Sequence, residues 1–361
     1  MRVLSATEAI SPALDRTKSV LFQPFRKGRS WKLAATAYLS AMGILFLPVP
    51  LALLFLPWLP PADGMNRLHF ALLFVGAIAI STAIMSALFY IGARLEFVLF
   101  DIVLFKATFV APLCNKYGVQ VRRWVGLKIA LGTLACSAIG IPYIVWLAHW
   151  TPPFPGQPGR PMSSEFVGSF ALILAIATAW ISFFMLCSSL LGDFILPYIA
   201  LEYATLKESI RRFSELFKTE PRQIIYFALF KVFLAIAGLV LQQIATLVME
   251  LVVFVPVGLI CFVGWLLLHS LGEIGQVLMT AGAVILELAG MVFVFYFLIG
   301  IQGCVITFFQ AYGLYFLGGR YPLLGDLLDR STPQPAFAYP AGFPPTPPQY
   351  PPPQPGSPPV A

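Results

Sequence analysis

Long apolar runs are the feature that most constrains how this chain can fold. Four of them lie at about Leu33–Leu59, Leu68–Ala93, Leu127–His149 and Phe166–Leu191. An α-helix needs about 20 apolar residues to cross a hydrocarbon core of about 30 Å, and each run reaches that length. Backbone groups in lipid must pair within their own segment, and the sequence has no alternating apolar and polar pattern typical of outer-membrane strands. The sequence therefore predicts an all-α, polytopic transmembrane helical bundle.

The composition excludes an ordinary soluble protein. Hydrophobic residues make up 59% of the 361 residues and charged residues 11%, whereas soluble domains carry roughly 25% charged residues. The polar residues are therefore too few to cover a soluble core, and lipid must solvate much of the surface.

A fifth apolar region, Ile224–Leu317, is too long for one span and must fold back. Two long helices, tilted or kinked, would give six spans in all. Breaks at Glu250–Pro256 and Gly300–Gly303 would instead give eight. Both counts are even, so both place the two termini on the same side of the membrane.

The Lys and Arg residues indicate which side that is, because positive residues are retained on the cytoplasmic side. Of the 23, 21 lie in four segments and two in the short loops between them. The four segments are 1–32, 94–128, 207–231 and 320–330, and the two loop residues are Arg67 and Arg160. We therefore expect both termini in the cytoplasm and a basic inner face suited to anionic headgroups.

Three parts follow from this layout. Residues 1–32 read as a cytoplasmic amphipathic segment, and residues 33–330 as the multi-pass transmembrane domain. Residues 331–361 have no charge and 13 prolines, which is typical of a disordered, Pro-rich tail. No packed core is expected in that tail.

The fourth run ends at a carboxylate and a proline. Asp193 lies where that span meets the cytoplasmic interface, and Pro197 lacks the N–H that would continue the helix. We interpret both as boundary residues, with a hydrated carboxylate at the interface. An ion-coordinating role for Asp193 is the alternative.

A basic helix is predicted directly after this boundary. Thr205 and Glu208 have capping-box spacing, and Glu208 with Arg212 and Arg211 with Glu215 form i,i+4 pairs. Apolar residues fall on one helix face and basic residues largely on the other, as in a helix lying in the interface plane. The basic residues expected to face lipid there and at the third span are Lys207, Arg211, Arg212, Lys218, Arg122 and Arg123.

Glu287 is the candidate for an intramembrane polar site. It lies about ten residues into an apolar run, where a charge costs roughly 2.5–3.5 kcal/mol on insertion scales. One hypothesis is a functional proton or ion site with Gln242, Gln243 and Gln302; the other is a neutral Glu287 that hydrogen-bonds across helices to one of these glutamines.

No motif supports an enzyme, a cofactor or a metal. The three histidines are far apart, the five cysteines occur singly, and no nucleophile and base stand at a recognisable spacing. Nothing resembles a nucleic-acid-binding module. We therefore expect a non-enzymatic protein whose partners are the lipid bilayer and a membrane protein or a second copy of the chain.

Three stretches carry a resemblance to a known family: "LLGDFILPYIALEYATLKESIRRF", "FALFKVFLAIAG" and "FFQAYGLYFLGGRYPLLGDLL". Over roughly residues 10 to 325 the chain resembles an uncharacterised family of bacterial multi-pass membrane proteins. It is more distantly similar to the membrane domain attached to some glycerophosphodiester phosphodiesterases, without their acidic and histidine cluster. The resemblance implies an inner-membrane helical fold and marks Asp193, Pro197, Tyr312 and Tyr315 as structural family positions.

Two functions compete at this point. The leading hypothesis is a scaffold or accessory subunit that acts through its basic cytoplasmic helices and Pro-rich tail. The rival is a transporter or lipid-handling protein that uses Glu287 and its neighbouring glutamines.

Overall fold

The computed structural model describes residues 2–23, 25, 27–45, 67–107, 109–149, 164–269 and 272–331. Within these ranges the chain is helical and has no strand, which confirms the all-α prediction for the described part. The helices are α1 (Ile10–Phe22), α2 (Lys27–Leu45), α4 (Arg67–Phe105), α5 (Ala111–Lys116), α6 (Gly118–His149), α7 (Ser164–Glu202), α8 (Leu206–Thr219), α9 (Pro221–Leu268), α10 (Gly272–Gly318) and α11 (Pro322–Ser331). The predicted Pro-rich tail lies outside the described residues, apart from Ser331.

Four helices in the described ranges are long and apolar enough to cross a membrane. They cover Val75–Phe105 in α4, Gly168–Glu202 in α7, and all of α9 and α10. The chain is therefore a helical, membrane-embedded protein. The other two predicted spans coincide with α2, whose continuation beyond Leu45 lies outside the described residues, and with α6. The count of six spans stays a prediction.

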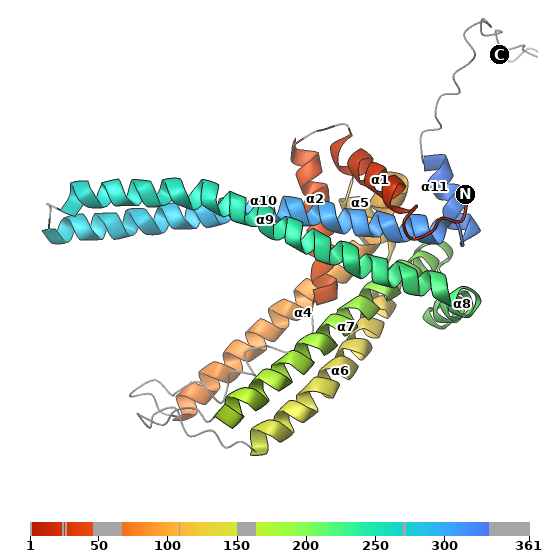
Figure 1. The fold of residues 1–361 in the computed structure, drawn as a ribbon, viewed down its shortest axis with the longest axis horizontal. Coiled ribbons are helices and arrows are strands. Elements are labelled where there is room, and N and C mark those ends of the chain that lie inside the picture. Colours follow the sequence, from red (N-terminus) through yellow and green to blue (C-terminus); the bar gives the residue numbers. More distant parts are fainter. Residues whose placement is uncertain are drawn as a thin grey trace, which may run out of the picture.

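The helices α9 and α10 form one long antiparallel hairpin (Figure 1). Neither Glu250–Pro256 nor Gly300–Gly303 breaks its helix, so the region follows the two-helix alternative rather than the one with extra breaks. The 48 residues of α9 would extend about 70 Å at 1.5 Å per residue, more than twice a hydrocarbon core of about 30 Å. The hairpin must therefore tilt or extend beyond the hydrocarbon.

Two arms diverge from one common region, which we call the hub (Figure 1). One arm is the α9–α10 hairpin, and the other consists of α4, α6 and α7. The buried side chains gather where the arms meet. Large members of this cluster are Phe97, Tyr117, Trp124, Phe194, Phe227, Tyr312 and Phe316.

Aromatic stacking joins the two arms within the hub. The Phe227 ring of α9 stacks on Tyr312 and Phe316 of α10, with centroids 4.9 and 4.3 Å apart. Phe194 of α7 meets the same ring edge-on at 5.5 Å. Such pairs contribute about 0.5–1.5 kcal/mol beyond the burial of their area.

The N-terminal segment is part of the hub. The Tyr312 hydroxyl donates to the Ala6 carbonyl at 2.9 Å. Arg16 of α1 is 3% exposed, and its guanidinium donates to the carbonyls of Val103 and Leu104 at 2.8 and 2.5 Å. These carbonyls lie in the last turn of α4, where the helix dipole favours a cation. Residues 2–22 thus close the end of a predicted span.

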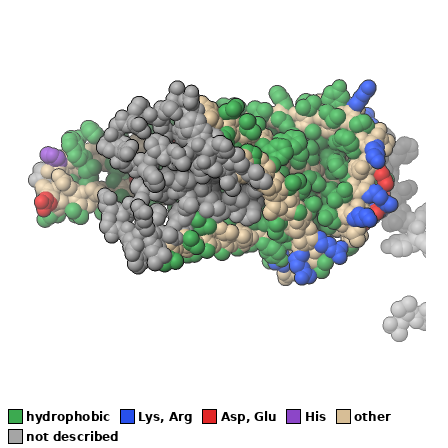
Figure 2. Space-filling model, turned by 90° about the horizontal axis from the view of Figure 1, so that it is seen from below, with side chains coloured by type: hydrophobic (Ala, Val, Ile, Leu, Met, Phe, Trp, Pro, Cys, Tyr) green, Lys and Arg blue, Asp and Glu red, His purple; other side chains and the backbone are tan. Residues whose placement is uncertain are grey.

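Away from the hub, the arms expose their apolar side chains. Leu172 and Leu174 of α7 are 62% and 57% exposed, and Leu241 and Leu259 of α9 are 66% and 64% exposed. Contiguous apolar surface on this scale requires lipid or a partner. In the view of Figure 2, the Lys and Arg side chains gather at the end of the molecule that carries α8 and α11 in Figure 1.

Gly303 lets α10 approach α2 closely. A Cβ added at Gly303 would overlap the backbone of Ala34, whereas one added at Gly300 would meet nothing within 4 Å. The two glycines lie in the same helix, so they differ in packing rather than in secondary structure.

We predict that Gly303→Ala lowers the free energy of unfolding, because the backbone of α2 must move. Overpacking of this kind costs about 1–3 kcal/mol. The matched control Gly300→Ala should be neutral or stabilising by up to about 1 kcal/mol, since Ala favours the helix. Thermal unfolding of the purified variants measures both, and equal unfolding temperatures would contradict the close approach.

Candidate functional site

A buried acid–base pair joins α4 to α6. The Glu96 carboxylate accepts hydrogen bonds from Lys128 Nζ and from Trp124 Nε1, the latter at 2.7 Å. Trp124 and Lys128 are four residues apart on α6 and so share one face, and Lys128 Nζ lies 5.3 Å from the centroid of the Trp124 ring. All three residues are at most 7% exposed.

A second buried pair joins α7 to α9. The Asp193 carboxylate accepts a hydrogen bond from Lys231 Nζ, and each residue is 6% exposed. Lys231 follows the hub residue Phe227 by four positions on α9. Gly313 of α10 lies against the carboxylate, because a Cβ added there would be 2.7 Å from Asp193 Oδ1. The pair thus lies inside the protein, enclosed by three helices.

The two carboxylates have matching places in their helices. Glu96 lies ten residues before Lys106, which follows the last residue of α4, and Asp193 lies ten residues before Tyr203, which follows the last residue of α7. Lys106 and Tyr203 both have a left-handed backbone, with φ of 52° and 54°. A left-handed residue directly after a helix is a common helix end, usually occupied by Gly.

The two lysines also match. Each follows a buried hub aromatic by four residues on the next long helix. The chain therefore builds the same arrangement twice: a long helix with an acid, a left-handed turn, a short helix, and a long helix with a lysine that pairs with the acid.

Both pairs line one small cavity of about 60 Å³. Its other polar lining consists of Ser40 of α2, Ser188 and Ser189 of α7, and Gln310 of α10. A volume of this size has room for about two water molecules or a small ion, but not for an organic substrate. The cavity is thus a small site, lined by charged and polar residues, where six helices converge.

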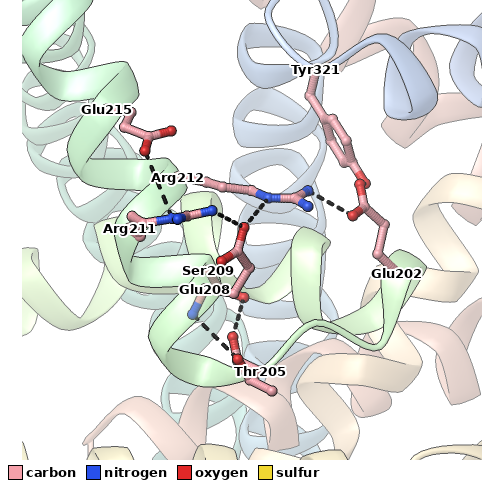
Figure 3. Close-up of polar contacts among 8 residues, drawn as sticks. All are labelled: Glu202, Thr205, Glu208, Ser209, Arg211, Arg212, Glu215 and Tyr321. Atoms are coloured by element: carbon pink, nitrogen blue, oxygen red, sulfur yellow. Dashed lines mark hydrogen bonds and ion pairs between the residues drawn. The ribbon is translucent and has the colours of Figure 1, made fainter.

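A polar corner connects α7 to α8 next to the hub (Figure 3). Thr205 caps α8, since its Oγ1 accepts from the Glu208 N–H at 3.4 Å, and this confirms the predicted helix start. The Glu208 carboxylate accepts from Arg211 and Arg212 at 2.9 and 3.1 Å. Arg211 also lies 3.7 Å from Glu215, so both predicted i,i+4 pairs are confirmed.

The polar corner also contacts Tyr321, in the segment between α10 and α11. Arg212 donates to Glu202 at 2.6 Å, and the Tyr321 hydroxyl donates to the other oxygen of that carboxylate at 2.5 Å (Figure 3). Burial raises the pKa of Tyr321, and its hydrogen bond to Glu202 raises it further. The hydrogen bond to Glu202 also raises the pKa of Arg212. These contacts fix α8 against α7 and against Tyr321, which lies between α10 and α11.

The side of α8 that faces away from the hub carries a basic surface, formed by the exposed residues Lys207, Arg211 and Lys218. Ile210 and Phe217 beside them are 40% and 42% exposed. Core contact is made instead by Ser209, Leu206, Phe213 and Leu216. The apolar residues of α8 therefore divide between the hub and the outside.

The other predicted basic residues fall into two groups. Arg122 and Arg123 are exposed in the first turns of α6. Arg212 is half-buried and belongs to the polar corner rather than to the basic surface.

The boundary residues lie elsewhere than expected. Asp193 is buried and paired with Lys231 instead of hydrated, and Pro197 lies inside α7, which continues to Glu202. The chain turns at Tyr203, whose left-handed backbone ends the helix. Lys231 thus supplies the positive charge that a buried carboxylate requires.

The structure separates Glu287 from the glutamines. In the hairpin, Gly238 faces Val305 at 3.6 Å and Gly290 faces Val253 at 3.0 Å. This register places Glu287 about 14 residues from Gln242, or roughly 20 Å along α9 at 1.5 Å per residue. Glu287 and Gln243 are exposed, and Gln242 and Gln302 are half-buried. The four residues do not form one site.

Sequence reasoning missed Glu96 and Lys128, and it did not pair Lys231 with Asp193. A signal was present in the paired patterns "RRWVGLK" and "YFALFK", each with an aromatic residue four positions before the lysine. Each pattern follows an acid-bearing span. The pairing itself depends on the tertiary arrangement, which no spacing reveals.

We predict a pH-dependent effect of Glu208→Gln. Hydrogen bonds from Arg212 and Arg211 lower the pKa of Glu208 below its ordinary value of 4.5. A lowered folded pKa stabilises the protein above the unfolded pKa, and this stabilisation is lost as the pH falls through the folded pKa. The unfolding temperature of the variant should therefore lie below wild type at neutral pH and converge with it below pH 4.5.

Thr205→Ala is the matched control, because it removes the uncharged cap of the same helix. Its cost of about 1 kcal/mol should persist at low pH. A Glu208→Gln difference that is constant with pH would contradict the assignment.

Comparison with known proteins gives one match. A family model described as a family of unknown function (DUF7544) covers residues 4–327. No curated protein and no solved structure matches the chain. The predicted likeness to an uncharacterised family is confirmed to that extent, while the bacterial origin and the distant likeness to the phosphodiesterase-attached domain stay predictions. The chain belongs to the family of unknown function DUF7544.

Proposed function

We propose that this protein is a non-enzymatic scaffold or accessory subunit of the bacterial inner membrane, acting at the cytoplasmic face. Its basic surface on α8 would bind anionic headgroups and orient a membrane-protein partner or a second copy of the chain. The observation that carries the proposal is the fixed exposure of Lys207, Arg211 and Lys218 beside Ile210 and Phe217.

The attachment of α8 supports this function. Its cap, its ion pair to Glu202 and its packing on the hub hold the helix against the membrane-embedded arms. A rigidly held basic surface loses little conformational freedom when it binds. Each Lys or Arg near an anionic membrane surface contributes about 1 kcal/mol, and the exposed apolar pair can enter the headgroup region.

The arrangement of the ends supports the proposed orientation. The N-terminal segment, α8 and α11 lie at the same end of the molecule (Figure 1). Arg320 reinforces this grouping, since it donates to the Leu4 carbonyl at 3.1 Å and to Glu220 at 2.9 Å. Placing that end in the cytoplasm agrees with the distribution of Lys and Arg along the chain.

The transport alternative built on Glu287 has no comparable support. It requires Glu287 near Gln242, Gln243 or Gln302, and the hairpin register separates Glu287 from these residues.

We predict that the triple variant Lys207→Gln, Arg211→Gln and Lys218→Gln loses affinity for anionic lipid. With about 1 kcal/mol per residue, the half-saturating fraction of phosphatidylglycerol should rise at least about tenfold. Native mass spectrometry of the full chain, titrated with phosphatidylglycerol against phosphatidylcholine, measures the shift. Arg212 is left intact because it holds the polar corner.

The matched control neutralises three exposed cations outside α8: Lys18, Lys32 and Arg330. It removes the same charge, so it should retain most of the lipid affinity. Equal losses of lipid affinity in the two triple variants would contradict the proposal, because net charge alone, and not its position on α8, would then determine lipid binding. No loss in the α8 variant, together with unchanged recovery of copurifying proteins, would overturn the proposed role.

A further inference from the structure

A groove of about 500 Å³ lies between the N-terminal segment and the first turns of α9. Residues 5–7 line one wall, and the α9 wall consists of Gln223, Tyr226, Leu229, Phe230 and Phe233. This volume falls within the range of about 300–1,000 Å³ that sites for organic ligands occupy. The groove can therefore hold a ligand that the small cavity between the two ion pairs cannot.

Both walls of the groove are held in place by other contacts. The Ala6 carbonyl accepts from the hydroxyl of Tyr312. Ser5 and Glu8 form a capping box, since the Ser5 N–H donates to the Glu8 carboxylate at 2.9 Å and the Glu8 N–H donates to Ser5 Oγ at 3.3 Å. On α9, Phe227 is fully buried in the hub. A groove with fixed walls loses little conformational freedom when it binds a ligand.

The α9 wall changes from polar to apolar along the helix. Gln223 lies in the first turn, and Leu229 and Phe233 follow about 9 and 15 Å further along, at 1.5 Å per residue. The helix α9 is long and apolar enough to cross a membrane. Tyr226 lies between the two parts, and tyrosine is enriched at the membrane interface. The polar end of the groove thus suits the headgroup region, and the apolar end suits the hydrocarbon.

The chemistry of the apolar end limits what can fill it. Leu229 and Phe233 are exposed and have no polar side-chain atom. Ordered water needs polar partners, so it does not fill such a space stably. An acyl chain from the surrounding bilayer needs none, and the lipid that carries it has a headgroup for the polar end. A lipid therefore matches both ends of the groove.

The charges at the polar end favour an anionic headgroup. Arg222 is exposed, and it lies on the groove side of α9 because it precedes a lining residue by four positions. The neighbouring charges compensate each other, since Arg2 pairs with Glu8 at 2.6 Å and Arg320 with Glu220 at 2.9 Å. Arg222 thus gives this end a net positive charge, which attracts anionic lipid.

We propose that this groove binds one anionic phospholipid, with an acyl chain between residues 5–7 and α9 and its headgroup beside Arg222. The bound chain connects the N-terminal segment to a predicted span. No residue of α8 lines the groove, so the inference goes beyond the proposed function of the basic surface and does not depend on it.

Photolabelling tests the site. Full-length protein is placed in phosphatidylcholine nanodiscs with a small fixed fraction of phosphatidylglycerol that carries a diazirine in one acyl chain. Phosphatidylcholine is then replaced stepwise by unlabelled phosphatidylglycerol, and the labelled residues are mapped by mass spectrometry. Labelling within residues 221–233 should fall at least about tenfold, because a large excess of unlabelled lipid competes for one site. Labelling of the exposed apolar residues of 239–252 should stay constant, because the probe fraction is constant.

Two outcomes of this experiment would overturn the proposal. One is labelling of residues 221–233 that stays as constant as that of 239–252, since the groove would then be ordinary lipid-facing surface. The other is a dimeric protein in which residues 221–233 are protected from the probe, since a second copy of the chain would then cover the groove.

Leu229→Trp is the variant that fills the groove. Leu229 is exposed, so the variant should fold, and the competed labelling of residues 221–233 should fall at least about tenfold. Its matched control is Ile225→Trp, at an exposed position one turn earlier that does not line the groove, and it should behave like wild type. Thr7→Phe fills the groove from the other wall and decides the question if Leu229→Trp fails to fold. Wild-type labelling in a folded groove-filling variant would overturn the proposal.

Arg222→Gln tests the position of the headgroup. One basic residue near an anionic headgroup is lost, so about fivefold more phosphatidylglycerol should be needed for half-maximal competition. The triple variant of α8 is the control, and it should leave the competition at residues 221–233 unchanged. An effect of the α8 variant without an effect of Arg222→Gln would assign the lipid to the basic surface and overturn the groove site.

Discussion

Burial of charge within the hub is the constraint on which the rest of this structure depends. A carboxylate taken from water into an apolar interior must be paired, because leaving it uncompensated costs several kcal/mol. Asp193 and Glu96 therefore fix where α9 and α6 can lie, since each must bring a lysine to a defined point. Dispersion and apolar burial alone would tolerate sliding of one helix along another. The ion pairs set the register of the helices, and aromatic stacking around Phe227 fills the space between them.

The repeated arrangement explains how a mostly apolar chain forms one hub with two arms. In each repeat a long acid-bearing helix is followed by a left-handed residue, Lys106 or Tyr203, and the chain returns as a long helix that carries the paired lysine. Toward the hub, the helices bury their side chains against one another. Away from it, the same helices expose apolar side chains that suit lipid. Basic groups remain at the hub end, where α8 is held by the corner around Glu202.

Much of the fold was predictable from the sequence, because apolar length and helix caps are local signals. The positions of α4, α6, α7, α9 and α10 follow from the apolar runs, and Thr205 begins α8 as its capping spacing predicts. Pro197 misled the prediction, because a proline terminates a helix by its missing N–H, yet α7 continues through it. The resemblance led to the right kind of family, one of unknown function.

The candidate site was much less predictable. An isolated Glu287 in an apolar run is an obvious candidate, because a charge in the hydrocarbon core costs free energy. The register of the hairpin, however, places it away from the glutamines. Asp193 looked like an interface residue when considered alone, and Lys231 was not paired with it. Only their contact, 38 positions apart in the chain, converts two separate charges into one buried pair. Contacts between distant segments depend on how α7 and α9 cross, and no local pattern contains that information.

A charge-reversal exchange tests the central claim most directly. The free energy of unfolding is compared for Asp193→Lys, for Lys231→Asp and for the double variant in the same detergent. If the buried pair sets the register of the helices, each single reversal places two like charges together and prevents stable folding, and the double variant recovers a large part of the loss. Single variants as stable as wild type, or a double variant no better than either single one, would contradict the account.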